Sequence, residues 1–420
     1  MENVPEFKAT VEISRKWDGN EVAEEIVNKI KNKNLNPKFI LLFTTIHYKN
    51  EFEKILTGIK NGFQNSLLIG STIAGFITSE GCFTRGVTAL SVDYPNMEIS
   101  VGIGRNTKKN PEKAALDCTA MIKDQKKQET WKNKLLLDII SATTVPQMFG
   151  KRTSVFIGNL PTAVLAKMLE VSTRRFQLGA GNIEIILDKL VENFKDRYIF
   201  GIGANDNNKF VSNYQFYNGN VEKNSVICLS ISTDKKLFFN ENIGGLKPTG
   251  KTLRITDKKL DGLLITKIND RPANDEFFNI MGWDKDTINE NTLFRKILYY
   301  PFVYKENGAL HPEIFGLFLG KSIACGNLMR GDDAEIYSSS GKNILESFRN
   351  LLPEKADLSI ILSCSMILET LGREIYKIKK TLDEHSTCYL LIFSGPEHFY
   401  NPENNVFMNR VISNQVISFI

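Results

Sequence analysis

Short apolar runs that alternate with amphipathic segments are the feature that most constrains this fold. Residues 38–45, 135–140 and 358–365 are dense in Ile, Leu and Phe, which is typical of strands covered on both faces. Residues 20–33 and 51–63 instead place apolar side chains at helical spacing. This alternation predicts an α/β fold of the mixed α+β kind, in which sheets are layered against helices.

The length of 420 residues favours two domains in tandem rather than one core. The segment Gly244–Gly250, GGLKPTG, is too rich in Gly and Pro for the interior of a helix or strand, so it is predicted to be a connector. We therefore expect a first domain over 1–240, a connector over 241–250 and a second domain over 251–420.

Composition narrows the classes of partner. The net charge is +5, and the basic residues are spread without an Arg-rich block, so no nucleic-acid surface is predicted. The six cysteines are far apart and form no C-x-x-C motif, which argues against a zinc site or a disulfide framework and fits a cytoplasmic protein with reduced thiols. No apolar stretch approaches the roughly 20 residues of a membrane helix, and the N-terminus does not resemble a signal peptide.

A cluster of small residues follows the apolar run that starts at Leu67. Gly70 to Gly75 are predicted to form a turn after a strand, with the Ser71 and Thr72 hydroxyls and nearby backbone N–H groups open to a ligand. The alternative is a packing turn in which small side chains let strands approach one another.

Cys364 and Glu397 each lie at or just past the end of a predicted strand, where ligands collect in layered α/β folds. One hypothesis is a pocket at the domain interface shared by these two residues with Ser71 and Thr72. An enzyme with Cys364 as nucleophile and Glu397 as base is an alternative, although no His–acid relay is visible. A buried, inert cysteine is the simpler interpretation of Cys364.

The four histidines, 47, 311, 385 and 398, show no metal-binding spacing, and each is expected on the surface or in a loop. His398 and His311 are the candidates for a haem ligand. The triplet Gly331-Asp332-Asp333 is interpreted as a solvated turn, so neither a metal nor a cofactor is predicted.

Several motifs resemble those of the FIST family, whose name stands for F-box and intracellular signal transduction. The pieces occur in the family's order over most of the chain. They are the Gly70–Gly75 segment, Gly201–Asp206, Tyr214–Val221 (YQFYNGNV), Asn269–Ala273 (NDRPA), Cys364, Glu397 and Asn409.

The resemblance implies a FIST N half and a FIST C half that form a sensory, ligand-binding module of signal transduction. It implies a small-molecule ligand, with an amino acid or a related metabolite as one candidate, and a separate signalling protein as partner, because no output module fits in this chain. A haem-based gas or redox sensor and a protein-interaction scaffold remain alternatives. The ligand-binding residues that it implies are Ser71, Thr72, Gly75, Asp206, Cys364, Glu397 and Asn409.

Overall fold

The computed structural model describes residues 5–33, 35–125, 130–144, 156–157, 167, 171, 177, 179, 181–284, 299–306, 308–325, 328–410 and 412–420. Within them one order of elements occurs three times: strand, helix, strand, helical segment, strand, hairpin, strand. We call these repeats unit 1 (residues 8–93), unit 2 (residues 97–233) and unit 3 (residues 237–419).

Unit 1 begins with a strand and a well-capped helix. The Asp18 carboxylate accepts the backbone N–H groups of Asn20 and Glu21, and one stripe of the helix is buried, which explains why it forms here. The elements are β1 (Lys8–Ser14), α1 (Gly19–Asn32), β2 (Phe39–Thr45), η1 (Ile46–Tyr48), α2 (Phe52–Gly62), β3 (Leu67–Ile73), β4 (Gly75–Thr78), β5 (Gly81–Phe83) and β6 (Val87–Asp93).

Unit 2 follows the same order. Its elements are β7 (Met97–Arg105), α3 (Pro111–Gln125), β8 (Asn133–Ser141), the short strand β9 (Phe156–Ile157), α5 (Ile183–Asn193), β10 (Tyr198–Ala204), β11 (Gln215–Tyr217), β12 (Asn220–Glu222) and β13 (Ser225–Thr233).

Unit 3 contains an insertion after its first strand. Its own elements are β14 (Leu237–Asn242), α8 (Gly341–Arg349), β23 (Leu358–Cys364), α9 (Ser365–Leu371), η4 (Gly372–Ile375), α10 (Tyr376–His385), β24 (Tyr389–Ser394), β25 (Glu397–Asn401), β26 (Val406–Arg410) and β27 (Asn414–Phe419). The insertion contains β15 (Lys247–Lys259), η2 (Leu260–Gly262), β16 (Leu264–Ile268), β17 (Arg271–Pro272), α6 (Ala273–Met281), β18 (Phe302–Glu306), β19 (Ala309–Glu313), β20 (Phe315–Leu319), β21 (Ser322–Cys325) and β22 (Asp333–Ser338).

Each unit builds a six-stranded sheet of the same topology, and each sheet borrows its last hairpin from another unit. The strand orders are β1-β6-β2-β3-β11-β12, β7-β13-β8-β10-β25-β26 and β14-β27-β23-β24-β4-β5. In all three the third and fourth strands are parallel and every other pair is antiparallel. Thus the hairpin of unit 2 completes the sheet of unit 1, that of unit 3 completes unit 2, and that of unit 1 completes unit 3.

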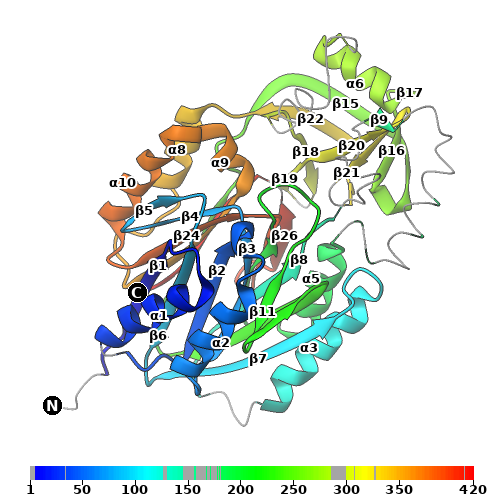
Figure 1. Cartoon of the computed structure of the whole chain (residues 1–420). Helices are drawn as coiled ribbons and strands as arrows, with labels where there is room; N and C mark the ends of the chain where they lie inside the picture. Colours follow the sequence, from blue (N-terminus) through cyan, green and yellow to red (C-terminus); the bar gives the residue numbers. More distant parts are fainter. Residues whose placement is uncertain are drawn as a thin grey trace.

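One shared core joins the three sheets. Alternate side chains of all three sheets form a single buried cluster that includes Phe43, Phe200 and Ile392, while the opposite face of each sheet packs on its own helices. Figure 1 shows these helices outside the sheets, with α1 and α2 in blue, α3 and α5 in cyan and green, and α8 to α10 in orange. The fourth strands, β3, β10 and β24, contact one another pairwise, so they surround the centre.

The strands of the insertion pair antiparallel with one another and, together with β9 of unit 2, form a nine-stranded sheet with α6 on one side, at the upper right of Figure 1. The aromatic side chains of Phe277, Phe302 and Phe318 are fully buried in it. The short strand β9 of unit 2 pairs in parallel with its β20.

These findings confirm the mixed α/β class and the layering of sheets on helices. The division into domains 1–240 and 251–420 stays a prediction, and strands from both halves pair with one another in two of the six-stranded sheets. The predicted connector 241–250 overlaps the end of β14 and the start of β15. The sequence also predicts helices over 161–168 and 289–298, and both ranges lie almost wholly outside the described residues. None of the helices in the described ranges is long and apolar enough to cross a membrane.

Candidate functional site

The carboxyl ends of β3, β10 and β24 meet at the centre of the molecule. Backbone hydrogen bonds join the three units there, so each strand end is fixed relative to the other two. They run from Asn205 N to Thr72 O (2.9 Å), from Ala74 N to Phe393 O (2.9 Å) and from Gly395 N to Gly203 O (3.4 Å). We call this region the central cluster, and we define it by the side chains of Ser71, Gln215, Asn205, Asn208, Ser365, Glu397 and Ser413.

Ser71 and Gln215 face each other across β3 and β11. Ser71 alternates with Ile69 and Ile73, which belong to the shared core, so its hydroxyl points to the inner side of the sheet. Both residues are fully buried, and neither Ser71 Oγ nor Gln215 Oε1 has a hydrogen-bond partner among the described residues. Such orphaned atoms are costly in a core, and they are left available to a ligand.

Asn205, Asn208 and Ser365 form a buried polar group that links units 2 and 3. The Asn205 amide donates to Asn208 Oδ1 (2.9 Å), and the Ser365 hydroxyl donates to the same oxygen (2.6 Å). The other end of the Asn208 amide, Nδ2, has no partner in the part of the chain that the structure describes. Two N–H donors are therefore available beside the first turn of α9.

Glu397 is the first residue of β25 and is completely buried. Ser413 donates its hydroxyl proton to Glu397 Oε2 (3.2 Å), whereas Oε1 has no partner within the described ranges. Burial raises the pKa of this carboxyl well above its usual value, which favours the neutral form, and that form can donate as well as accept a hydrogen bond.

Cys364 ends β23 next to this carboxyl. Its thiol is buried, and its pKa is raised first by burial and further by the proximity of Glu397. Because a protonated thiol is a poor nucleophile, this environment gives Cys364 the character of a packed core residue.

The predicted turn after Leu67 is wrong in its position. Gly70, Ser71 and Thr72 continue β3, because β11 of unit 2 pairs with them and supplies the hydrogen bonds that a turn would have left open. Thr72 points to the other face from Ser71, and its hydroxyl oxygen accepts from Tyr214 N (3.1 Å). Gly75 opens β4, where an added Cβ would lie 2.8 Å from the Phe83 carbonyl oxygen. Gly75 therefore allows a close strand approach.

Asp206 and Asn409 occupy different settings. Both carboxylate oxygens of Asp206 accept backbone N–H groups of its own loop, two each, from residues 209 to 212. This arrangement shapes the loop that leads to Gln215. Asn409 lies on β26 opposite His398 in the ladder.

His398 differs from the expected loop residue. It is fully buried on β25, and its Nε2 is hydrogen-bonded to Oδ1 of Asp138 on β8. Between them on β10 stands Gly201, where a Cβ would lie 2.1 Å from His398 Nε2. The expectation of a surface or loop position was wrong because the residue enters a sheet of another unit. Asp138 occupies Nε2 of the imidazole, and Nδ1, although it has no partner among the described residues, is buried with the rest of the ring.

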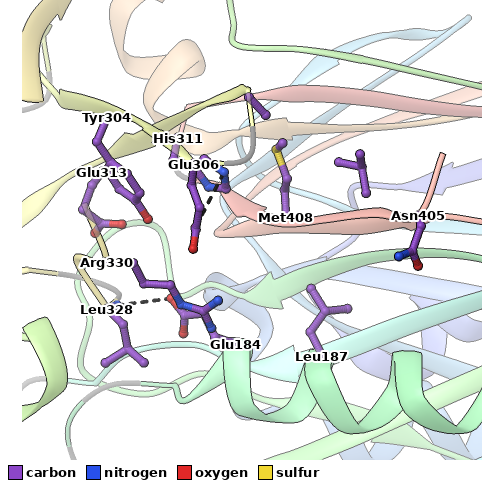
Figure 2. A pocket seen from close by; sticks show the side chains of 12 residues that line it. Glu184, Leu187, Tyr304, Glu306, His311, Glu313, Leu328, Arg330, Asn405 and Met408 are labelled. Atoms are coloured by element: carbon purple, nitrogen blue, oxygen red, sulfur yellow. Dashed lines mark hydrogen bonds and ion pairs between the residues drawn. The ribbon is translucent and has the colours of Figure 1, made fainter. Parts of the chain in front are cut away.

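His311 lies in the insertion, in a pocket of about 100 Å³ between α5, the β18–β19 hairpin and β26 (Figure 2). Its ring stacks on Tyr304 at 5.1 Å between centroids, and its Nε2 lies 3.9 Å from Glu306 Oε2. Glu184 of α5 accepts the Leu328 backbone N–H (3.2 Å) at the opposite wall. This volume is well below the roughly 300–1,000 Å³ of pockets for larger ligands, so a haem does not fit here.

Sequence reasoning missed most of the central cluster. The sequence marks Gln215 only as part of a motif, and its patterns do not single out Asn205, Asn208, Ser365 or Ser413. The run Asn205-Asp206-Asn207-Asn208 was the available signal, because adjacent amides after a strand must find buried partners or a ligand. In the ranges that the structure covers, no group of three or more His, Cys, Asp or Glu side chains is placed to hold a metal ion.

One of three comparisons with known proteins, the scan against family models, agrees with the resemblance seen in the motifs. No curated protein sequence matches the chain. Among solved structures, a crystal structure of cyanuric acid hydrolase from A. caulinodans aligns with 56% of this chain and 72% of its own at 8% identity, with a TM-score of 0.30. The family model of the FIST N domain matches residues 38–271, which is more than half of the chain. The chain therefore belongs to the FIST N domain family, whose members are sensory, small-ligand-binding domains of signal transduction.

Proposed function

We propose that this protein is a sensory module that binds a small polar metabolite at the central cluster and passes the event to a separate signalling protein. One observation carries the proposal: four buried polar atoms without partners among the described residues gather where β3, β10 and β24 end. They are Ser71 Oγ, Gln215 Oε1, Asn208 Nδ2 and Glu397 Oε1. Because each orphaned atom costs free energy, a ligand that satisfies them together would bind with a corresponding gain.

The chemistry of these atoms favours a ligand with both donors and acceptors. The Asn208 amide and the protonated Glu397 carboxyl can donate, whereas Gln215 Oε1 accepts and Ser71 does either. An amino acid or a related metabolite carries a carboxylate and an ammonium at this scale, so it is the class that we propose.

The position of the cluster suggests how binding would be reported. Ser71 belongs to unit 1, Gln215 and Asn208 to unit 2, and Glu397 to unit 3. A ligand held by all of them would bind more tightly to one relative arrangement of the units than to others. A population shift requires such a difference in affinity between conformations. The exchanged hairpins would carry that arrangement to the outer helices, where we propose that the partner binds.

The rival functions have weaker support. An enzyme with Cys364 as nucleophile needs a thiolate, whereas burial keeps this thiol protonated, so we propose binding without turnover. A haem sensor needs an accessible imidazole, whereas His398 is completely buried and its Nε2 is engaged by Asp138. A scaffold without a ligand would leave the four orphaned atoms unexplained. We also propose a cytoplasmic location, because all six cysteines are free thiols.

The first test is a native mass spectrum of freshly purified protein, followed by thermal melts with individual amino acids. Ser71→Ala should weaken the binding of a hit by up to about tenfold, since one hydrogen bond contributes roughly 0.5–1.5 kcal/mol. Ser91→Ala is the matched control, because Ser91 is also fully buried with an orphaned hydroxyl but lies on β6 away from the cluster.

Both variants should fold with little change in stability, since each removes a hydroxyl that has no partner. If the affinity for the ligand falls equally in both variants, or falls in neither, then the ligand binds elsewhere and the proposed site is wrong.

A further inference from the structure

An arginine of unit 1 is held in place without an acceptor for its hydrogen bonds. Arg85 lies between β5 and β6 and is partly exposed. Its Nη1 atom is buried and has no hydrogen-bond partner among the described residues, and no carboxylate there pairs with the side chain. A guanidinium offers five N–H donors in a fixed plane, and buried donors normally have acceptors. Arg85 therefore lacks the partner that its chemistry requires.

The ring of Trp17 positions this guanidinium. Cζ of Arg85 lies 4.0 Å from the centroid of the Trp17 ring, which is a close cation–π contact. The Trp17 ring in turn stacks on Tyr48 at 6.4 Å between centroids and 28° between ring planes. Because these contacts already order the arginine, less conformational entropy is lost when it binds an anion.

The Tyr48 hydroxyl is a second donor without a partner. Tyr48 is 1% exposed, and its hydroxyl has no hydrogen bond in the part of the chain that the structure describes. Burial raises the pKa of this phenol, and the positive charges of Arg85 and Arg15 act in the opposite direction. Tyr48 and Arg85 both pack on Trp17, so an O–H and an N–H donor without acceptors lie in one aromatic cluster.

The positive charge extends to His47 and to a loop of unit 2. His47 Nδ1 lies 3.2 Å from Thr45 Oγ1, and the same oxygen accepts the Gly86 N–H (3.3 Å). The imidazole is therefore tied to the residue that follows Arg85. The pKa of His47 is lowered by partial burial and then by the charges of Lys209 and Arg85, and within the described ranges neither cation has an ion-pair partner.

The acidic residues near this group are engaged by other cations. Glu25, whose charge also acts on the Tyr48 phenol, accepts a serine hydroxyl and pairs with Lys29 at 3.1 Å. Asp18 accepts two N–H groups at the start of α1 and pairs with Lys54 at 3.6 Å. Neither carboxylate pairs with the arginine, so its positive charge is left for an anion from solution.

We propose that Arg85 and Tyr48, beside His47, form a binding site for an oxyanion, the carboxylate or phosphate group of a small molecule. The guanidinium would donate two parallel N–H bonds to the anion, as arginines do to carboxylates and phosphates. Trp17 is 66% exposed, and a shift of its ring would open the Tyr48 hydroxyl for a third bond. The site shares no residue with the central cluster, so it does not depend on the proposed function.

The test uses two probes of constant charge near neutrality: acetate for a carboxylate and sulfate for a phosphate group. Melting temperature is measured against probe concentration, at an ionic strength held constant with sodium chloride, for the wild type, Arg85→Met, Tyr48→Phe and Arg373→Met. Arg373→Met is the matched control, because Arg373 is an exposed arginine of η4 in unit 3 without an ion-pair partner among the described residues.

One probe is expected to stabilise the wild type and Arg373→Met with the same saturable dependence on concentration. The concentration that gives half of the effect should rise about tenfold or more in Arg85→Met, which loses the charge and both parallel bonds. It should rise about threefold to tenfold in Tyr48→Phe, which loses one hydrogen bond. The more effective probe identifies the anion class. Equal saturable stabilisation of all four proteins, or none of the wild type, overturns the proposal.

The wild type alone provides a second test if Arg85→Met does not fold. An anion bound at Arg85 offsets the positive charge beside His47, so saturation with the effective probe should raise the pKa of the imidazole. The pKa is followed by the NMR signal of the ring C–H groups, which is assigned by its absence in His47→Gln. A pKa of His47 that does not change on saturation refutes the site.

Discussion

The Asp206 carboxylate holds the loop that connects β10 to β11, and replacing it tests how the central cluster is positioned. Oδ1 accepts the backbone N–H groups of Lys209 (3.1 Å) and Phe210 (2.7 Å), and Oδ2 accepts those of Val211 (2.8 Å) and Ser212 (2.8 Å). In Asp206→Asn one oxygen becomes an NH₂ group, which can accept from neither of the two N–H groups in front of it. Whichever way the amide is turned, two donors lose their acceptor.

The magnitude follows from those two donors. Leaving a partly buried donor without an acceptor costs about 1–3 kcal/mol, so Asp206→Asn should lose about 2–6 kcal/mol of the free energy of unfolding. This is a large share of the roughly 5–15 kcal/mol of an ordinary domain, so the urea midpoint should fall clearly. Tryptic cleavage after Lys209 should also become faster, because the loop opens more often.

Asp18→Asn is the matched control for this substitution. At the start of α1, Oδ1 of Asp18 accepts both helix N–H groups, from Asn20 (2.9 Å) and Glu21 (3.2 Å), while Oδ2 forms only an exposed ion pair with the Lys54 ammonium (3.6 Å). Asn retains one such oxygen and is as good an N-cap as Asp, so the urea midpoint should barely move. If Asp206→Asn is as stable as the wild type, or if the two substitutions cost the same, then the four bonds to Asp206 do not hold the loop and the reasoning is wrong.

Three further outcomes are expected. Gly201→Ala should cost at least about 3 kcal/mol in urea unfolding, because its Cβ would overlap the buried His398–Asp138 pair; a soluble variant of wild-type stability would contradict this packing. Glu397→Gln should gain stability relative to the wild type as the pH rises above about 4.5. Because the pKa of Glu397 is raised in the folded wild type, its unfolding releases a proton at these pH values, and Gln does not titrate. A difference in unfolding free energy between the two proteins that stays constant from pH 4 to pH 8 would argue against a neutral carboxyl. Cys364 should resist iodoacetamide at pH 8 until the protein unfolds, as followed by peptide mass mapping, and rapid native labelling would show an accessible thiolate.

Local patterns predicted the elements well where each element supplies its own signal. The strand over 38–45 and the helix over 51–63 are found as β2 and α2, because their apolar spacing is set by burial on two faces or on one stripe. The pattern over 368–382 predicts a single helix, but the structure divides this segment among α9, η4 and α10. Gly372 has a φ of 51°, a left-handed conformation that glycine adopts without a Cβ clash and that interrupts a regular helix.

Pairing between units could not be predicted in the same way. Strand β11 is three residues long, and it completes a sheet whose β3 precedes it by more than 140 residues. The sequence of β11 does not specify its partner strand, because the register of a strand depends on the surface against which it packs. For this reason the small residues after Leu67 suggested a turn, and His398 suggested a loop, although both lie in strands that another unit completes.

The three units share a scaffold but differ in chemistry at one set of corresponding positions. The first inner-facing residue of the exchanged hairpin is Phe76 on β4, Gln215 on β11 and Glu397 on β25, opposite Ile392, Ser71 and Ile202 respectively. Phe76 belongs to the shared core and has no polar atom to satisfy, whereas Gln215 and Glu397 each keep an orphaned oxygen among the described residues. A repeated fold needs three side chains of suitable size at these positions, and apolar ones would serve it best. The two that are polar and incompletely bonded are therefore better explained by a ligand than by the fold, and their unequal chemistry would fix that ligand in a single orientation about the pseudo-threefold centre.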